Sequence, residues 1–333
     1  MTSTPAPATP LPIAEASDLA HRVLDAVDGA LVGKRAQTTL VLAGVLAGGH
    51  VLLEDLPGLG KTLAARSLAQ ALGLEFTRAQ FTPDLLPADL TGSYLYDQNA
   101  GEFSFREGPV FTGLLLADEI NRTPPKTQSA LLEAMQEHQV TVEGRTFPLP
   151  RPFHVLATAN PIEHEGTYPL PEAQLDRFLL RLSFGYPDAD EEWDVLARRI
   201  GRKQEEQTVT PVLDAAGLLR VQAAVEEVYV AESVGRYAID LVRATREHQD
   251  TLVGASPRGS LALLLCARAI ALIEGRDFVV PEDIKRLAVP ALAHRLVIRP
   301  ELWLNDVKPE TIVSSVLGAV PVPDAPTGPG QRR

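Results

Sequence analysis

The stretch from His50 to Leu63 reads HVLLEDLPGLGKTL, and it decides the fold of this chain. The apolar run near its start predicts a buried strand, and the LAARSLAQAL that begins at Leu63 has the apolar spacing of a helix. A loop rich in proline and glycine joins the two. A strand, a glycine-rich loop and a helix in this order form a site for nucleotide phosphates, because backbone N–H groups and the helix N-terminus face the anion.

The residues of this loop have separate expected roles. Lys61 is expected to reach the β- and γ-phosphates of ATP, and the Thr62 hydroxyl to bind Mg²⁺. Asp55 stands where the consensus G-x-x-x-x-G-K-[ST] has its first glycine, so the match is incomplete. A chance GKT in a surface turn is the alternative, and the strand and helix on either side count against it. The residues expected to contact the nucleotide are Pro57, Gly58, Leu59, Gly60, Lys61, Thr62 and Leu63.

Composition limits the class of protein. The 333 residues are enough for about two domains, and the 45% hydrophobic fraction can supply a full core. With 31 basic and 43 acidic residues the formal net charge is −12, which speaks against broad binding to nucleic acid or anionic lipid. Cys266 is the single cysteine, so neither an internal disulfide nor a cysteine metal cluster is expected. No apolar run approaches the roughly 20 residues that span a bilayer, and the N-terminus lacks a secretion signal, so we expect a cytoplasmic protein.

Short apolar strands alternate with helical stretches through the first half of the chain. Besides the strand at Val51, the candidates are residues 76–81, 114–117, 154–159 and 179–184. This alternation predicts an α/β fold in which helices cover both faces of a parallel sheet, with ligands at the carboxyl ends of the strands. Residues 86–108 and 139–153 interrupt the alternation and are expected to be hairpins, either surface loops or elements that touch a partner.

The strands are expected to stop after Pro187, where a series of helical patterns begins. These patterns predict a separate all-helical domain. Ser17 is expected to be the N-cap of the first helix in the chain. The expected division is a disordered tail at 1–16, an α/β core at 17–187, a helical domain at 188–318 and a second disordered tail at 319–333.

Polar residues end two of the predicted buried strands. Asp118 and Glu119 follow LLLA, and Asn160 ends HVLATAN. Asp118 is expected to hold Mg²⁺ directly or through water, and Glu119 to take a proton from the attacking water. Asn160 is expected to orient that water. The alternatives are an acidic pair that caps the next turn and an asparagine that serves the turn before Pro161.

Two arginines complete the expected site. Arg177, in LPEAQLDRF, could stabilise charge on the γ-phosphate of a neighbouring subunit, with Asp176 orienting it. Arg258, in GASPRGS, is expected in the first turn of a helix, where a cation opposes the helix dipole and needs an anion such as ATP nearby. The alternatives are a surface ion pair for Arg177 and a solvated side chain for Arg258.

These features, in this order and spacing, resemble the AAA+ ATPases and, more narrowly, the MoxR family. The resemblance covers roughly residues 18–318 and includes VGK, EDLPGLGKT, FTPDLLPADLTG, GPVFTGLLLADEINR, FHVLATANPIEHEGTYPLPEAQLDRF and GASPRGSLAL. It implies an AAA+ P-loop core with a parallel five-stranded sheet and a C-terminal all-helical lid. It also implies Walker A at Gly58 to Thr62, Walker B at Leu114 to Glu119, sensor 1 at Asn160, an arginine finger at Arg177, sensor 2 at Arg258, and Val32 and Gly33 over the adenine. EDLPG-like sequences look normal for this family, so Asp55 does not argue against ATP binding.

The resemblance further implies an Mg²⁺-dependent ATPase that forms a hexameric ring and acts as a chaperone. Such a protein would remodel or mature client protein complexes, with a partner that carries a von Willebrand factor A domain. Three alternatives stay open: a nucleic-acid motor, a small-molecule phosphotransferase and a chelatase-like motor subunit. The net charge of −12 counts against the first, and Arg177, Arg258 and the helical domain count against the second. Only family resemblance separates the third from the main interpretation.

Overall fold

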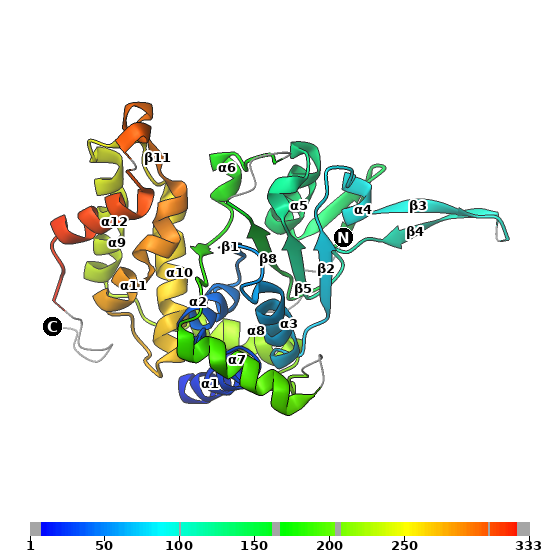
Figure 1. Ribbon diagram of the computed structural model, residues 1–333, viewed down its shortest axis with the longest axis horizontal. Helices are drawn as coiled ribbons and strands as arrows, with labels where there is room; N and C mark the ends of the chain where they lie inside the picture. The colour runs from blue at the N-terminus through cyan, green and yellow to red at the C-terminus, as the bar shows by residue number, and fades with distance from the viewer. Residues whose placement is uncertain (1–7, 100, 162–166, 204–207, 306, 325–333) are drawn as a thin grey trace.

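The computed structural model describes residues 8–99, 101–161, 167–203, 208–305 and 307–324 (Figure 1). The disordered tails predicted at the two ends therefore lie partly outside the described residues, at 1–7 and 325–333. Within the described residues, no helix is long and apolar enough to cross a membrane.

A five-stranded parallel sheet forms the centre of the fold, with the strand order β2-β5-β8-β1-β9. The α/β fold expected from the sequence is confirmed, and each predicted strand is present. The strands are β1 (Val51–Glu54), β2 (Phe76–Gln80), β5 (Leu114–Asp118), β8 (His154–Ala159) and β9 (Leu180–Leu182). Strands β5 and β8 are buried along their whole length, as continuous apolar runs inside a parallel sheet require.

Helices cover both faces of this sheet, because alternate residues of each strand point to opposite sides. Leu114 and Leu116 of β5 belong to a core that also contains residues of α1 (Ile13–Asp28), α2 (Arg35–Leu46) and α3 (Lys61–Ala71). Leu115 and Ala117 point the other way, into a second core with α5 (Pro125–Glu137). The carboxyl ends of the strands therefore lie between the helices that pack on the two faces of the sheet.

The first helix differs from the expectation. It begins at Ile13, inside the predicted tail, so Ser17 lies within the helix and is not its N-cap. The Ser17 hydroxyl donates to the Ile273 carbonyl oxygen at 2.9 Å. The prediction that Ser17 caps the helix is therefore wrong. Its hydroxyl bonds a distant helix instead of the N–H groups of its own helix.

Both interrupting segments are hairpins, as predicted. Strands β3 (Gly92–Asp97) and β4 (Glu102–Glu107) pair antiparallel and extend away from the body of the protein (Figure 1). Strands β6 (Gln139–Val142) and β7 (Arg145–Pro148) form the second hairpin. Its turn residues, Glu143 and Gly144, have φ angles of 49° and 78°, as a two-residue hairpin turn requires.

The C-terminal part is mainly helical. Its helices are α7 (Ala189–Arg202), α8 (Ala215–Glu226), α9 (Glu232–Glu247), α10 (Pro257–Ile273), α11 (Pro281–Leu292) and α12 (Pro309–Ala319). Asp188 caps α7, accepting from the N–H groups of Asp190 and Glu191. The expectation that strands stop after Pro187 is wrong at one place, because β10 (Thr251–Val253) pairs antiparallel with β11 (Val297–Ile298).

The domain limits stay a prediction. Helix α8 packs against α1 and α2 as well as α10, so contacts between the two predicted domains are extensive (Figure 1). The remaining short elements are α4 (Pro87–Thr91), α6 (Glu172–Leu175) and 3₁₀ turns at Ile120–Arg122, Ala293–Arg295 and Pro300–Asn305.

Candidate nucleotide site

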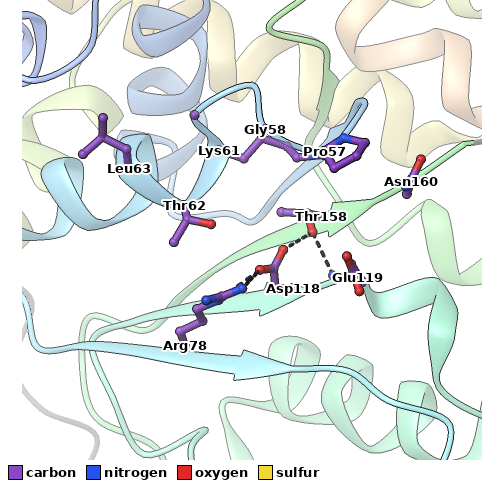
Figure 2. Close-up of a pocket in the computed structure, with 11 residues that line it drawn as sticks. Pro57, Gly58, Lys61, Thr62, Leu63, Arg78, Asp118, Glu119, Thr158 and Asn160 are labelled. Carbon is purple, nitrogen blue, oxygen red and sulfur yellow. Dashed lines mark hydrogen bonds and ion pairs between the residues drawn. The ribbon is translucent and has the colours of Figure 1, made fainter. Parts of the chain in front are cut away.

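A cavity of about 390 Å³ lies at the carboxyl edge of the sheet (Figure 2). The structure brings to it residues from the glycine-rich loop and from the ends of β2, β5 and β8. They are Pro57, Gly58, Gly60, Lys61, Thr62, Leu63, Arg78, Asp118, Glu119, Thr158 and Asn160. Segments that are about a hundred residues apart in the sequence therefore share one cavity, as the strand-end argument expects.

The loop has the geometry of an anion cradle. Gly58 and Gly60 both have a φ of 82°, a left-handed conformation that glycine adopts without steric cost. Gly60 directly precedes α3, and no described side chain caps that helix. The first N–H groups of α3 thus have no intrahelical acceptor, and they lie where phosphate oxygens could accept from them.

Lys61 lies at the floor of this cradle. Its ammonium Nζ donates to the backbone oxygen of Asp55 at 2.6 Å. Burial lowers the pKa of Lys61, while the carboxylates of Asp55, Asp118 and Glu119 oppose that shift. A partly buried cation with acidic neighbours suits a position that a polyphosphate enters, because the phosphate replaces the lost hydration.

Asp55, which departs from the consensus, has a structural explanation. Its Oδ2 atom accepts from the backbone N–H groups of Phe184 and Gly185 at 2.6 and 3.0 Å, and the residue is buried. This carboxylate joins the end of β1 to the chain that leaves β9. A glycine there would leave both N–H groups without this acceptor.

The end of β5 carries the candidate metal ligand. Asp118 Oδ1 accepts from the Thr158 hydroxyl at 2.6 Å, and Oδ2 accepts from Arg78 (Figure 2). The Thr62 hydroxyl lines the same cavity. Hydroxyl and carboxylate oxygens are donors that Mg²⁺ prefers, and Mg²⁺ commonly uses one or two such groups together with phosphates and water. The donor set therefore fits the ion expected from the sequence.

Glu119 is held in a defined orientation beside Asp118. Its φ of 57° is unusual for a residue with a side chain, and its N–H donates to the Thr158 hydroxyl at 2.8 Å. Its Oε2 atom accepts from Gln80 Nε2 at 2.7 Å and from Arg122 at 3.1 Å. This turn aims the carboxylate into the cavity, where a general base is expected.

Asn160 is buried and lines the same cavity from the end of β8 (Figure 2). Its backbone oxygen accepts from Asn121 Nδ2 at 3.1 Å. The sequence thus led to the correct place for this residue, because it is the first polar position after a buried strand.

A second cavity, of about 490 Å³, adjoins the first through Gly58, Gly60 and Leu63. Val32 and Leu59 line it, together with residues of α7. Gly33 does not, and its φ is 69°; a Cβ atom there would collide with the Glu191 side chain. The positive φ of Gly33 favours glycine at this position, while Val32 lies where a base could pack.

Neither Arg177 nor Arg258 lines the two cavities. Arg258 is in the first turn of α10, as predicted, and its Nε lies 3.9 Å from Asp176 Oδ2. The sequence suggested that Asp176 orients Arg177. In the structure the Asp176 carboxylate instead pairs with Arg295 at 2.7 Å and accepts from the Ser256 hydroxyl at 3.0 Å. Arg177 Nε is buried and has no hydrogen-bond partner among the described residues.

Sequence reasoning missed the side chains that hold the acidic pair. Arg78 and Gln80 point to one side of β2, two residues apart, and Thr158 precedes the end of β8. Alternation of polar residues on a predicted strand was the available signal. This signal could not show that Arg78 and Gln80 lie beside Asp118 and Glu119, because the sequence does not reveal that β2 is the neighbour of β5.

Comparison with known proteins agrees with this geometry. The family described as ATPase family associated with various cellular activities (AAA) matches residues 50–180, and the AAA lid domain family matches residues 243–316. YeaC of Bacillus subtilis, an uncharacterised protein, is 48% identical over 92% of this chain and 95% of its own. The chaperone MoxR1 of Mycobacterium tuberculosis is 43% identical over 93% of this chain and 84% of its own.

A solved structure gives the same result for the fold. The crystal structure of a candidate ATPase from Cytophaga hutchinsonii matches with a TM-score of 0.87 and 41% identity, over 94% of this chain and 97% of that one. The relatives at 48% and 43% identity extend over nearly the whole chain, so the similarity is not confined to the nucleotide cavity. This chain therefore belongs to the MoxR family of AAA+ ATPases.

Proposed function

We propose that this protein is an Mg²⁺-dependent ATPase that works as a ring and remodels protein partners. The observation that carries the proposal is the convergence of Lys61, Thr62, Asp118, Glu119 and Asn160 on one cavity. Each of these residue types has a distinct part in phosphoryl transfer to water. The name of the relative MoxR1, a chaperone, supports the remodelling part.

We assign each residue a role that its place in the two cavities supports. The phosphates of ATP bind the backbone from Gly58 to Thr62 together with Lys61, and the base packs against Val32 in the adjoining cavity. Thr62 and Asp118 hold Mg²⁺, which neutralises charge on the phosphates. Glu119 accepts the proton of the attacking water, and Asn160 orients that water.

A shared site accounts for the arginines that lie outside the cavities. Arg177 acts as a finger on the γ-phosphate bound by the next protomer of a ring, which we take to be a hexamer. Its side chain is partly exposed and lies outside both cavities of its own protomer, which supports a partner on another protomer. Arg258 forms a long ion pair with Asp176, with 3.9 Å between Nε and Oδ2. In this proposal it breaks that pair to contact bound nucleotide.

The β3–β4 hairpin is the element we assign to contact with the client. Leu95, Tyr96 and Phe103 are 45%, 55% and 70% exposed on it, although large apolar side chains are usually covered. The client, a partner with a von Willebrand factor A domain, and the cytoplasm as the place of action all belong to this proposal.

The test is ATP turnover as a function of protein concentration, for the wild type and for Glu119→Gln. The wild type should lose specific activity on dilution, because a site shared between protomers is lost on dissociation. Glu119→Gln should bind a fluorescent ATP analogue normally and hydrolyse ATP far more slowly. Glu133→Gln, an exposed change on α5, is the control. Turnover by Glu119→Gln at the wild-type rate would remove Glu119 from the base role.

A further inference from the structure

Arg78 is bonded to one of the two carboxylate oxygens of Asp118. Its Nε and Nη2 atoms donate to Asp118 Oδ2 at 3.0 and 2.6 Å (Figure 2). Nη2 also donates to Gln80 Oε1 at 2.9 Å. Arg78 comes from β2, the edge strand, and its side chain is 48% exposed, whereas that of Asp118 is 12% exposed. A cation from the edge of the sheet is thus paired with the carboxylate assigned to the metal.

The carboxylate has little capacity left for another ligand. Its two oxygens offer about four lone-pair sites. Arg78 donates to two of them at Oδ2, and the Thr158 hydroxyl donates to one at Oδ1. Thr158 is buried and accepts from the Glu119 N–H, whereas the Arg78 side chain is half exposed and also bonds Gln80 outside the carboxylate. Of the two contacts, the one to Arg78 is therefore the one that can be given up.

The positive charge of Arg78 also opposes the binding of a metal ion at Asp118. A guanidinium cannot lose its proton in a protein, so Arg78 stays positive at every accessible pH. A divalent cation brought to Asp118 would then lie beside a fixed positive charge in a partly water-excluded cavity, where like charges repel more strongly than in bulk water.

We propose that Arg78 competes with Mg²⁺ for Asp118: it is a resident cation on this carboxylate and must withdraw from it when Mg²⁺ binds. The pair therefore raises the Mg²⁺ concentration needed for metal-assisted binding of nucleotide. Gln80 Oε1 already accepts from Nη2, so it offers the guanidinium an alternative partner when the bond to Asp118 is given up. This inference rests on the proposed function.

The experiment is a Mg²⁺ titration of the binding of a fluorescent ATP analogue, with nucleotide affinity also measured in EDTA. In Arg78→Gln the Mg²⁺ concentration at half-saturation should fall about tenfold relative to the wild type, because the competing cation is gone. Arg78→Lys, which keeps a positive charge, should lie between the two. Arg66→Gln removes an exposed arginine from α3 and should leave the Mg²⁺ requirement unchanged.

The outcomes are distinct. An unchanged or higher Mg²⁺ requirement in Arg78→Gln would overturn the inference, since it would mean that Arg78 only orients Asp118 and assists the metal. A fall matched by an equal gain in affinity in EDTA would also overturn it, because the effect would then belong to the nucleotide. Failure of the wild type to bind nucleotide under any condition would instead defeat the proposed function, and the inference with it.

Discussion

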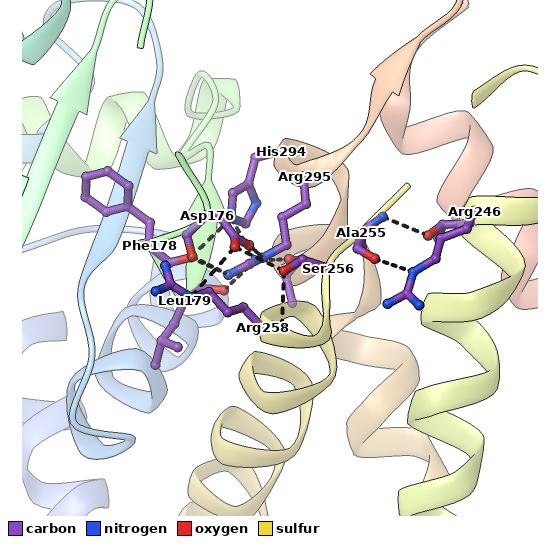
Figure 3. Close-up of polar contacts among 11 residues, drawn as sticks. Asp176, Phe178, Leu179, Arg246, Ala255, Ser256, Arg258, His294 and Arg295 are labelled. Carbon is purple, nitrogen blue, oxygen red and sulfur yellow. Dashed lines mark hydrogen bonds and ion pairs between the residues drawn. The ribbon is translucent and has the colours of Figure 1, made fainter. Parts of the chain in front are cut away.

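The Asp176 carboxylate pairs with the Arg295 guanidinium at 2.7 Å, and this contact joins the segment that carries Arg177 to the helical C-terminal part of the chain (Figure 3). The Arg295 side chain is only 2% exposed. It also donates to the backbone oxygen of Phe178 at 2.8 Å, so it contacts the residues on both sides of Arg177. The placement of Arg177 therefore depends on the packing of its own protomer.

Replacing Arg295 should destabilise the protein strongly. Arg295→Met leaves the Asp176 carboxylate without its main partner, and removal of one member of a buried pair costs about 3–5 kcal/mol. Because Asp176 retains some solvent contact, we expect the lower end of that range. Urea unfolding measures the loss. The matched change Arg236→Met, whose pair with Glu232 is exposed, should cost less than about 1 kcal/mol. Equal costs for the two variants would show that the Asp176 pair is not structural.

Arg177→Ala should abolish turnover while leaving nucleotide binding intact. An arginine that reaches the γ-phosphate from a neighbouring subunit contributes about 10³-fold or more to the rate. Mixing Arg177→Ala with Glu119→Gln should recover part of the activity, because the second variant supplies the arginine that the first lacks. Measurement of phosphate release from the mixture decides the matter. If the mixture is as inactive as its components, Arg177 acts only within its own chain.

Asp55→Ala should lower stability although it lies in the phosphate loop segment. The substitution leaves the N–H groups of Phe184 and Gly185 without their carboxylate acceptor. Leaving a buried N–H donor without its acceptor costs about 1–3 kcal/mol. Chemical denaturation in the absence of nucleotide is the measurement. Asp240→Ala, an exposed change on α9, is the control and should have little effect. A stability near that of the wild type would show that water replaces the carboxylate.

His50 should make the protein less stable at acidic pH. Its Nδ1 accepts from Val155 N–H at 3.0 Å and its Nε2 lies 3.1 Å from the Met135 oxygen, so the neutral ring is fully bonded. Burial lowers the pKa of His50 from 6.5 to about 3. Only the unfolded chain binds a proton between these values. The contribution of the neutral ring is thus fully present above pH 6.5, and it is lost as the pH falls towards about 3.

Between pH 7 and pH 5 this loss amounts to about 2 kcal/mol of unfolding free energy. His50→Gln should therefore lose about 2 kcal/mol less than the wild type over the same interval in urea unfolding. His21→Gln, an exposed change on α1, should follow the wild type. Parallel pH profiles for His50→Gln and the wild type would assign the acid sensitivity to other groups.

Local patterns predicted the elements that depend on neighbouring residues. The strands and hairpins were found because side-chain alternation and turn residues are properties of short segments. The errors occurred where a distant segment intervenes. Ser17 has the chemistry of a cap but donates to Ile273, and β10 is a strand only because β11 lies beside it.

The phosphate loop, the acidic pair at the end of β5 and the asparagine at the end of β8 were determined by the sequence itself. Each is a short pattern whose chemistry and local geometry come from consecutive residues. Tertiary structure alone decided that Arg78 pairs with Asp118 and that Arg295 pairs with Asp176, across 40 and 119 residues. The physical reason is that such contacts arise from the order of strands and the packing of helices, and these minimise the free energy of the whole chain rather than of any one segment.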